Sequence, residues 1–345
     1  MKRREAGYDR LRSAVRSWKG ARVLILGDVI LDEFILGRTD RVSREAPVVV
    51  VRYDGSACSP GGAANAAQNV ASLGGVAVPV AVIGDDDSGV RLRELLRERG
   101  IAIRHLIVAR GLMTTTKTRV MAGDFHAQRQ QVIRIDREQC REIPPRIEDR
   151  VLAAFAREAA RANAALLSDY HQSLFTPRII RESIGLCRAA RVPVVVDSRF
   201  RLNDFSHVTI ATPNEVEAAR AAGVELGSED SLRHIGRRLL GRLAARAILV
   251  TRGKFGMILF ERGRRSVSVD VVGSREATDV TGAGDTVAAA VSLTIAAGHP
   301  MQVAMQLANI AASIVVMKRG TAVVSSGEVI EAIDRLERGE RSSGA

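Results

Sequence analysis

The chain has 345 residues, of which 46% are hydrophobic and 26% charged, as is ordinary for a folded globular protein. That length allows two domains, or one large α/β domain with an attachment, and the composition excludes disorder along the whole chain. The formal net charge is +12, from 51 Lys and Arg against 39 Asp and Glu. Such a balance leaves nucleic acid, a membrane surface and small anionic substrates open as partners.

Three further features narrow the class. No run of about 18 apolar residues occurs, so no transmembrane helix is predicted. The three cysteines form no CxxC pattern and the six histidines form no HExxH motif, which disfavours a zinc site and favours a reducing cytoplasm. Residues 1–20 are basic, lack a secretory apolar core and predict a short amphipathic helix with Leu11, Val15 and Trp18 on one face; a membrane-surface helix is the alternative.

Hydrophobic periodicity predicts the elements of an α/β domain. Short apolar runs predict strands, in chain order, at 22–27, 76–83, 101–108, 164–168, 193–197, 208–211 and 247–251, with a hairpin-like pair at 256–260 and 265–271. Helical patterns predict a helix that ends near residue 74 and helices at 88–99, 147–162, 177–190, 214–222, 229–244, 284–297, 300–316 and 326–337. After residue 146 strands and helices alternate strictly, which predicts a doubly wound, mostly parallel sheet with helices on both faces.

Two stretches differ from that rhythm and predict a small β-sheet lid. Residues 33–58 alternate in polarity and are rich in valine, and residues 112–136 hold two strands that are polar on one face. The expected organisation is an N-terminal extension over 1–20, one domain over 21–338 that includes the lid, and a flexible tail over 339–345.

The most informative motif runs from Asp279 to Asp285 (Asp-Val-Thr-Gly-Ala-Gly-Asp), just before an Ala-rich helix. Glycines at 282 and 284 allow close approach of a ligand, and the free N–H groups of a helix start favour an anion. The Asp285 carboxylate beside that site would suit a general base for a hydroxyl group. The alternative is a Gly-rich loop in which Asp285 only stabilises the helix start.

Two motifs near the N-terminus indicate a sugar site. In Pro-Gly-Gly-Ala-Ala-Asn, Gly61 and Gly62 free the backbone, and Asn65 offers a donor and an acceptor to hydroxyl groups. After the first strand, the carboxylates of Asp28 and Asp32 could bind a diol. The alternatives are tight packing at a helix start for the first motif and turn chemistry for the second.

Two motifs in the C-terminal half suggest phosphate binding. Asn214 with Glu217 predicts a helix capping box, or a Mg²⁺–phosphate network in which Glu217 acts through water. Thr251, Gly253 and Gly256 follow a strand and predict either a backbone cradle for nucleotide phosphates or an ordinary hairpin turn. The chain has no P-loop, no GxGxxG after the first strand and no GxSxG elbow, which disfavours three other α/β classes.

Taken together and in this order, these motifs resemble the ribokinase-like (PfkB) family of carbohydrate kinases, over about residues 20–338. The resemblance implies a parallel α/β sheet, a β lid over the sugar and ATP held by the C-terminal half. By the same resemblance Asp285 would be the base, and Gly282, Ala283 and Gly284 the anion hole. The residues implied for the sugar are Asp32, Gly61, Gly62 and Asn65. Those implied for ATP and Mg²⁺ are Asn214, Glu217, Thr251, Gly253, Gly256 and Asn309, and those bordering a monovalent-cation (K⁺) loop are Asp279, Thr281 and Gly320.

A closer resemblance is to the D-glycero-β-D-manno-heptose 7-phosphate kinases, which transfer phosphate from ATP to the anomeric hydroxyl of a sugar phosphate. The segments that carry it are Gly27–Asp32, Ser43–Pro47, Thr116–Arg119, Gln130–Asp136, Ser168–Tyr170 and Lys318–Thr321. Lys117, Arg119 and Arg134 would suit a phosphorylated substrate, since cations pair with phosphate, and the alternative for each is a solvated strand charge. The bifunctional members also carry an adenylyltransferase domain, which this chain is too short to include.

The sequence departs from that branch at two places. His171-Gln172-Ser173 replaces a small residue followed by Lys-Gly, and Asp197-Ser-Arg-Phe200 replaces Asp-Pro-Lys-Gly. Arg199 thus takes the place of a lysine and is predicted, like the lid cations, to meet an anionic substrate, and Phe200 adds bulk. The acceptor therefore stays open, with ribose, fructose and nucleoside kinases as alternatives and a non-catalytic sugar- or nucleotide-binding protein as another. Nucleic acid is not an expected partner, because the arginines are dispersed and only 3% of residues are aromatic. A homodimer through the lid and a cytoplasmic location are expected.

Overall fold

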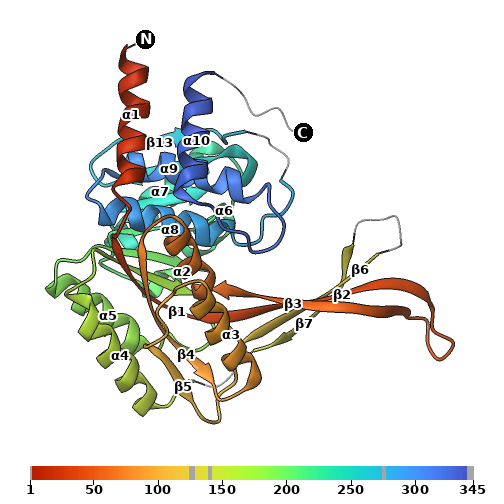
Figure 1. Ribbon diagram of the computed structural model, residues 1–345. Coiled ribbons are helices and arrows are strands. Elements are labelled where there is room, and N and C mark those ends of the chain that lie inside the picture. Colours follow the sequence, from red (N-terminus) through yellow and green to blue (C-terminus); the bar gives the residue numbers. More distant parts are fainter. Residues whose placement is uncertain (1, 124–128, 139–141, 274–276, 340–345) are drawn as a thin grey trace.

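A computed structural model describes residues 2–123, 129–138, 142–273 and 277–339. Within them a large sheet forms the centre of the molecule (Figure 1). Its nine strands, in order across the sheet, are β13 (Val267–Val269), β12 (Met257–Glu261), β11 (Ala247–Thr251), β10 (Ile210–Ala211), β9 (Val194–Ser198), β8 (Ala164–Asp169), β1 (Arg22–Gly27), β4 (Val76–Gly84) and β5 (Leu106–Ala109). All neighbours from β5 to β11 are parallel, and β12 and β13 add an antiparallel edge.

Helices cover both faces of this sheet, because its strands are apolar on both sides. In β1, Val23 and Ile25 enter one core while Leu24 and Leu26 enter the other. The helices over the first core are α1 (Lys2–Arg16), α2 (Ala63–Ser72), α3 (Asp87–Glu98), α8 (Ala283–Ala296), α9 (Met301–Val315) and α10 (Ser326–Glu337). Those over the second are α4 (Pro145–Ala159), α5 (Pro177–Ala189), α6 (Glu215–Ala222) and α7 (Glu229–Arg242). The predicted doubly wound fold is confirmed.

A second sheet of four strands leaves the body at the carboxyl end of β1 and extends to the right in Figure 1. Its order is β3 (Val49–Gly62), β2 (Val29–Val42), β6 (Thr116–Gly123) and β7 (Gln130–Arg137), with β2 and β6 parallel and the other pairs antiparallel. The predicted lid is therefore present, and its first two strands reach further toward the body than the sequence pattern indicated.

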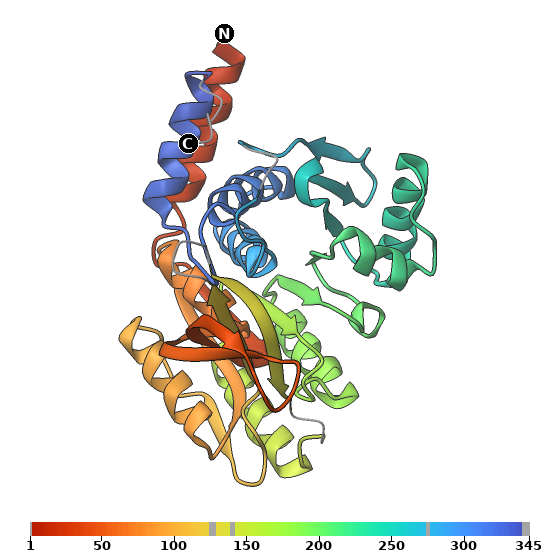
Figure 2. The ribbon, with the colours of Figure 1, turned by 90° about the vertical axis from the view of Figure 1, so that its right-hand side faces the viewer.

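The N-terminal extension packs on the domain. Helix α1 lies beside α10 (Figure 2), and Leu11, Val15 and Trp18 are buried as the amphipathic pattern predicted. The indole of Trp18 donates to the Thr294 hydroxyl at 3.2 Å, which ties this segment to α8. Of the tail predicted over 339–345, residues 340–345 lie outside the described part of the chain.

One predicted strand is shorter than its apolar run. The run over 101–108 forms a strand only from Leu106, because the N–H of Ile101 donates to the Leu96 carbonyl at 2.9 Å and so ends helix α3 instead of joining β4. Ile101 is nevertheless buried, so its side chain serves the core without sheet pairing. Periodicity identified the burial of this segment and not its backbone pairing.

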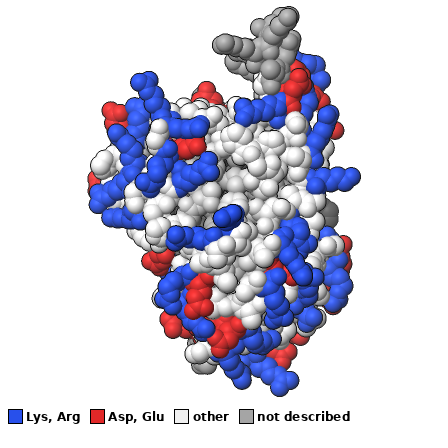
Figure 3. Space-filling model, turned by 90° about the vertical axis from the view of Figure 1, so that its left-hand side faces the viewer, with Lys and Arg blue, Asp and Glu red and all other residues white. Residues whose placement is uncertain are grey.

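The basic charge is spread over separate areas of the surface. The face in Figure 3 carries Lys and Arg in several groups, with acidic side chains and neutral surface between them. Many arginines are paired; Arg12, for example, contacts Asp9, Asp334 and Glu337. In the described part of the chain no helix combines the length and hydrophobicity needed to cross a bilayer.

Two glycines of α7 provide a test of the packing against the sheet. A Cβ at Gly236 would overlap the buried Phe260 ring of β12, whereas a Cβ at Gly241 would meet open space. We expect Gly236→Ala to lower the free energy of unfolding by about 1–3 kcal/mol through overpacking. Gly241→Ala, the matched control, should instead raise it by up to about 1 kcal/mol. Urea denaturation measures both, and equal effects would contradict the packing described.

Candidate active site

The N-terminus of α8 brings the central motif to the carboxyl edge of the large sheet. Gly282 precedes the helix with φ 81°, a left-handed conformation that favours glycine. A Cβ there would also lie 2.6 Å from the Asn65 side-chain nitrogen. The Ala283 N–H donates to the Val280 carbonyl at 3.2 Å, so the first-turn donors that remain for an anion are those of Gly284 and Asp285.

Asp285 stands in the first turn of this helix with both carboxylate oxygens engaged. Asn65 donates to Oδ2 at 2.7 Å, and the Tyr170 hydroxyl donates to Oδ1 at 2.7 Å. The side chain is only 3% exposed, and burial raises the pKa of Asp285 to about 6 against the opposing effect of these two hydrogen bonds. The carboxylate is therefore mainly ionised at neutral pH, although it is buried.

The amide of Asn65 is itself fixed by a buried polar network. Gln68 donates to its Oδ1 at 2.9 Å, and Asn69 does so at 3.2 Å. The Thr286 hydroxyl in turn donates to Asn69 at 2.9 Å, which links helices α2 and α8. Asn65 is thus orientated before any ligand is present, and sequence reasoning missed the supporting glutamine and asparagine.

A cavity of about 180 Å³ that is open to solvent borders the α8 N-terminus, has no lid strand residue among those that line it, and gathers several of the predicted nucleotide residues. Thr251, Gly253, Gly256, Gly284 and Asn309 all line it. Lys254 and Ser313 are the polar members of its remaining wall, which is otherwise apolar, from Met257, Val271, Ala277, Val280, Ala283, Val287, Ala312 and Val316. An apolar slot that opens onto a helix N-terminus fits a flat ring joined to an anionic chain.

Asn214 and Glu217 form the capping box that the sequence offered as the structural alternative. Each side chain accepts from the other residue's N–H at 2.9 Å at the start of α6. Desolvation raises the pKa of Glu217. Desolvation, together with the neighbouring acids Glu217 and Asp285, raises the pKa of Asp197 to about 8. The Arg199 guanidinium acts on all three carboxyl groups and lies 4.5 Å from the centre of the Tyr170 ring, and Arg220 acts on Glu217 as well.

The lid presents a charged face toward this region. One row of cross-strand neighbours on this face consists of Asp32, Lys117 and Asp136. The next row on the same face holds Arg119 and Arg134. Arg119 contacts Asp32 at 2.5 Å, and Arg134 makes a bidentate contact with Asp136 at 2.7 and 2.5 Å. Lys117 lies 4.0 Å from Asp136. The three predicted cations therefore lie together, each beside an acid.

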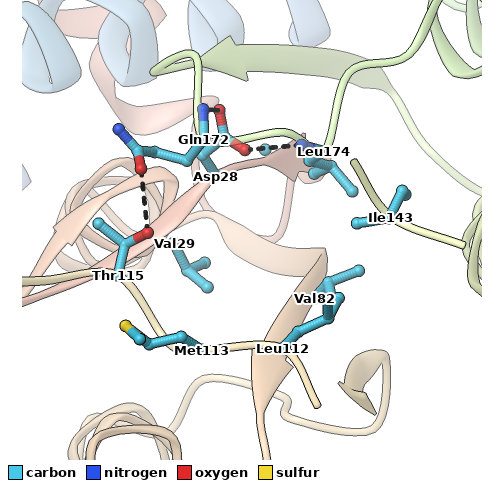
Figure 4. Close-up of a pocket in the computed structure, with 10 residues that line it drawn as sticks. Asp28, Val29, Val82, Leu112, Met113, Thr115, Ile143, Gln172 and Leu174 are labelled. Atoms are coloured by element: carbon cyan, nitrogen blue, oxygen red, sulfur yellow. Dashed lines mark hydrogen bonds between the residues drawn. The ribbon is translucent and has the colours of Figure 1, made fainter. Parts of the chain in front are cut away.

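Asp28 differs in its surroundings from Asp32. Its carboxylate accepts from the main-chain N–H groups of Tyr170, Gln172 and Leu174 at 2.8, 3.1 and 3.3 Å. It also borders a small pocket, where Figure 4 shows the bonds to Gln172 and Leu174. Burial and the neighbouring Asp169 raise the pKa of Asp28 to about 7. These contacts hold the loop after β8, and the predicted role of Asp28 in sugar binding stays a prediction.

The two glycines that end β3 fit close to these acids. A Cβ on Gly61 would overlap the Asp32 carboxylate, and Gly62 has φ 57° beside the Asp28 carbonyl. At the other end of the site, Asp279 accepts from the N–H groups of Thr281 and Gly320, both at 2.9 Å. The three residues predicted to border a cation loop therefore meet. The described residues contain no group of three His, Cys, Asp or Glu close enough to share a metal ion directly.

The sequence model of the pfkB family carbohydrate kinases matches residues 22–326. The chain belongs to this family. It is 39% identical to the bifunctional protein HldE of Geotalea uraniireducens over 313 residues, which cover 90% of this chain and 63% of that protein. It is 40% identical to HldE of Caulobacter sp. over 93% of this chain and 64% of the relative, so it spans less than two thirds of these relatives.

The fold agrees with this family. An Arabidopsis thaliana ribokinase, solved with ribose and ATP, superposes with a TM-score of 0.70 at 18% identity and covers 91% of this chain and 99% of that one. The family and the fold class that the sequence motifs predicted are confirmed. The predicted roles of single residues remain predictions that the geometry above makes testable.

The two glycines of the α8 N-terminus should respond differently to alanine. In Gly282→Ala, the left-handed backbone and the contact with Asn65 should cost about 1–3 kcal/mol of the free energy of unfolding. Gly284 has open space at its Cβ position and helical geometry, so Gly284→Ala should not destabilise the free protein. Thermal and urea unfolding of the two variants measure this, and a stable Gly282→Ala protein would contradict the described cap.

Proposed function

We propose that the chain is an ATP-dependent sugar kinase that transfers the γ-phosphoryl group to a hydroxyl of a sugar phosphate, most like a heptose 7-phosphate 1-kinase. The observation that carries this proposal is the position of Asp285. It is a buried, mainly ionised carboxylate at a helix N-terminus, between a cavity suited to a nucleotide and a lid face suited to an anionic sugar.

In this function Asp285 takes the proton of the acceptor hydroxyl as the sugar oxygen bonds to the γ-phosphorus and the bond to the ADP oxygen breaks. The N–H groups of Gly284 and Asp285 face the charge that develops on the transferred group. Asn65 holds the base, and the lid excludes the water that would otherwise attack ATP.

Mg²⁺ bound with ATP would neutralise phosphate charge. The chemistry of this region fits such a cation, because Glu217 and Asp285 both lie near enough to Asp197 to raise its pKa. Since no three of the described acidic groups converge on one point, we place Glu217 near the ion through water. Asp279, Thr281 and Gly320 would border a monovalent cation such as K⁺.

The lid cations support a phosphorylated acceptor. The Arg134 guanidinium binds both carboxylate oxygens of Asp136, and it could bind two oxygens of a phosphate group in the same bidentate way. The motifs shared with the heptose phosphate branch and the HldE relatives support this acceptor class. Phe200 is 57% exposed and stacks against Arg220, so its bulk lies at the surface.

The test is ADP release in MgCl₂ with a panel of acceptors: ribose, fructose, a nucleoside, fructose 6-phosphate and heptose 7-phosphate. We expect turnover with sugar phosphates, and Asp285→Asn should lower kcat by about 10³-fold while an ATP analogue still binds. Asp334→Asn on α10 is the charge-matched control and should leave kcat unchanged. Turnover only with unphosphorylated sugars would overturn the acceptor class, and near-normal turnover of Asp285→Asn would overturn the mechanism.

We also propose a homodimer through the lid. Strand β7 is an open, fully exposed edge, and Ile133 and Ile135 on the face opposite the charged rows are 53% and 48% exposed. Such an edge is normally paired or protected.

Sedimentation should show a dimer for the wild-type chain at micromolar concentration and a monomer for Ile133→Asp/Ile135→Asp. Val90→Asp on α3, at a residue that is likewise about half exposed (56%), is the control and should remain dimeric. A wild-type monomer would contradict this assembly.

A further inference from the structure

Tyr170 joins the catalytic region to the loop after β8, and the resemblance gave its side chain no role. Its hydroxyl is 2.7 Å from Asp285 Oδ1, and its backbone N–H donates to Asp28 at 2.8 Å. The Arg199 guanidinium lies over its ring at 4.5 Å. The side chain is therefore fixed at three points, by its main chain, its ring and its hydroxyl.

The loop that carries Tyr170 is built for this position. His171 has φ 61° and Ser173 has φ 73°, left-handed values that are costly for residues other than glycine. These two turns direct the N–H groups of residues 170, 172 and 174 to the single carboxylate of Asp28. Asp28 thereby offsets the strain, and the consequence is a defined place for the phenol.

The two donors on Asp285 differ in their freedom. Asn65 is held within the buried amide network of α2, which fixes its amide nitrogen toward Oδ2. The Tyr170 side chain is half-buried and its hydroxyl can rotate about the C–O bond, both donating and accepting. Burial and the neighbouring Asp285 carboxylate raise the pKa of the Tyr170 phenol above its usual value, so the phenol stays protonated as a donor.

We propose that Tyr170 is a positioning residue for phosphoryl transfer, which holds Asp285 Oδ1 toward the acceptor hydroxyl and stabilises the ionised carboxylate until the proton arrives. This inference rests on the proposed function of Asp285. When the carboxylate takes the proton, the Tyr170 oxygen is within reach to accept a hydrogen bond from the new carboxylic acid, so the same contact serves both states.

Other charges also act on Asp285, so the test has to separate their effect from that of the Tyr170 hydroxyl. Arg199 favours its ionised form, whereas Asp32 on the lid disfavours it. Asp197 lies near enough for the two carboxylates to raise each other's proton affinity. A change confined to the Tyr170 hydroxyl leaves all three in place.

The experiment uses Tyr170→Phe in the full chain, with Tyr8→Phe as the matched control, because the Tyr8 hydroxyl contacts only the Leu336 carbonyl in α10 among the contacts described. Loss of one hydrogen bond to a charged group should lower kcat roughly tenfold, with KM for the sugar phosphate within about twofold. The acidic limb of the kcat/KM profile should move to higher pH, because the ionised carboxylate loses a stabilising donor and the pKa of Asp285 rises above about 6.

A second replacement at Tyr170 should shift the acidic limb of the pH profile in the opposite direction. The chain has 3 tyrosines, so a Tyr8→Phe/Tyr53→Phe background leaves Tyr170 alone for replacement by 3-fluorotyrosine, a stronger donor. The acidic limb should then move to lower pH. A wild-type profile in both proteins would overturn the inference, as would a stability loss without a pH shift in Tyr170→Phe. If Asp285→Asn also kept its turnover, the proposed function itself would fail, so the two failures are distinguishable.

Discussion

The arrangement of the site depends on the hydrogen bonds that hold one buried carboxylate, that of Asp285. Burial alone would protonate Asp285, and two hydrogen bonds from opposite sides limit that effect, so its pKa is about 6. One donor comes from α2 and the other from the loop after β8, while the carboxylate itself belongs to α8. Three segments that lie far apart in the sequence therefore meet at one side chain, and the glycine at 282 exists because Asn65 has to approach the helix start closely.

The rest of the fold positions partners around this point. Parallel strands end at one edge, so the loops after β1, β8, β9 and β11 face the same space. The lid begins directly after β1, and its Asp32 lies near enough to act on Asp285, while Gly284, the residue before Asp285, lines the cavity on α8. The apolar cavity and the charged lid face are chemically distinct, and the helix N-terminus between them is where a phosphoryl group could pass from one to the other.

Sequence patterns predicted most of this fold, because strands with apolar residues on both faces and amphipathic helices leave clear periodicities. They failed where backbone pairing competes with capping, as at Ile101. Motif residues such as Asp285 and Asn65 were found because the glycines beside them mark positions where the backbone is left-handed or closely approached. Gln68, Asn69 and Tyr170 were not assigned roles, because their contribution depends on distant contacts: Tyr170 meets Asp285 115 residues away, and Thr286 meets Asn69 across 217 residues. Tyr170 also lies in a strained loop that no local pattern specifies.

The structure shows what the residues contact at the two places where the chain departs from the heptose 7-phosphate kinases. At Asp197–Phe200, the arginine that replaces lysine stacks on Tyr170, and the phenylalanine that replaces glycine lies at the surface under Arg220. At 171–173, the left-handed backbone directs three N–H groups to Asp28. Both departures therefore act on the support of Tyr170 as much as on any contact with substrate.

The same arrangement has a cost in stability. Asp285, Asp28 and Asp197 have pKa values of about 6, 7 and 8 in the folded protein, against 3.8 as the ordinary value for an aspartate. A raised pKa means that folding is favoured most when the group is protonated, so this contribution is full below pH 3.8 and is lost as the pH rises toward 6 to 8. At neutral pH the burial of these groups therefore lowers the stability of the free protein relative to acidic pH. Cations that bind with the nucleotide would favour the ionised forms, so ligand binding and stability are coupled through these acids.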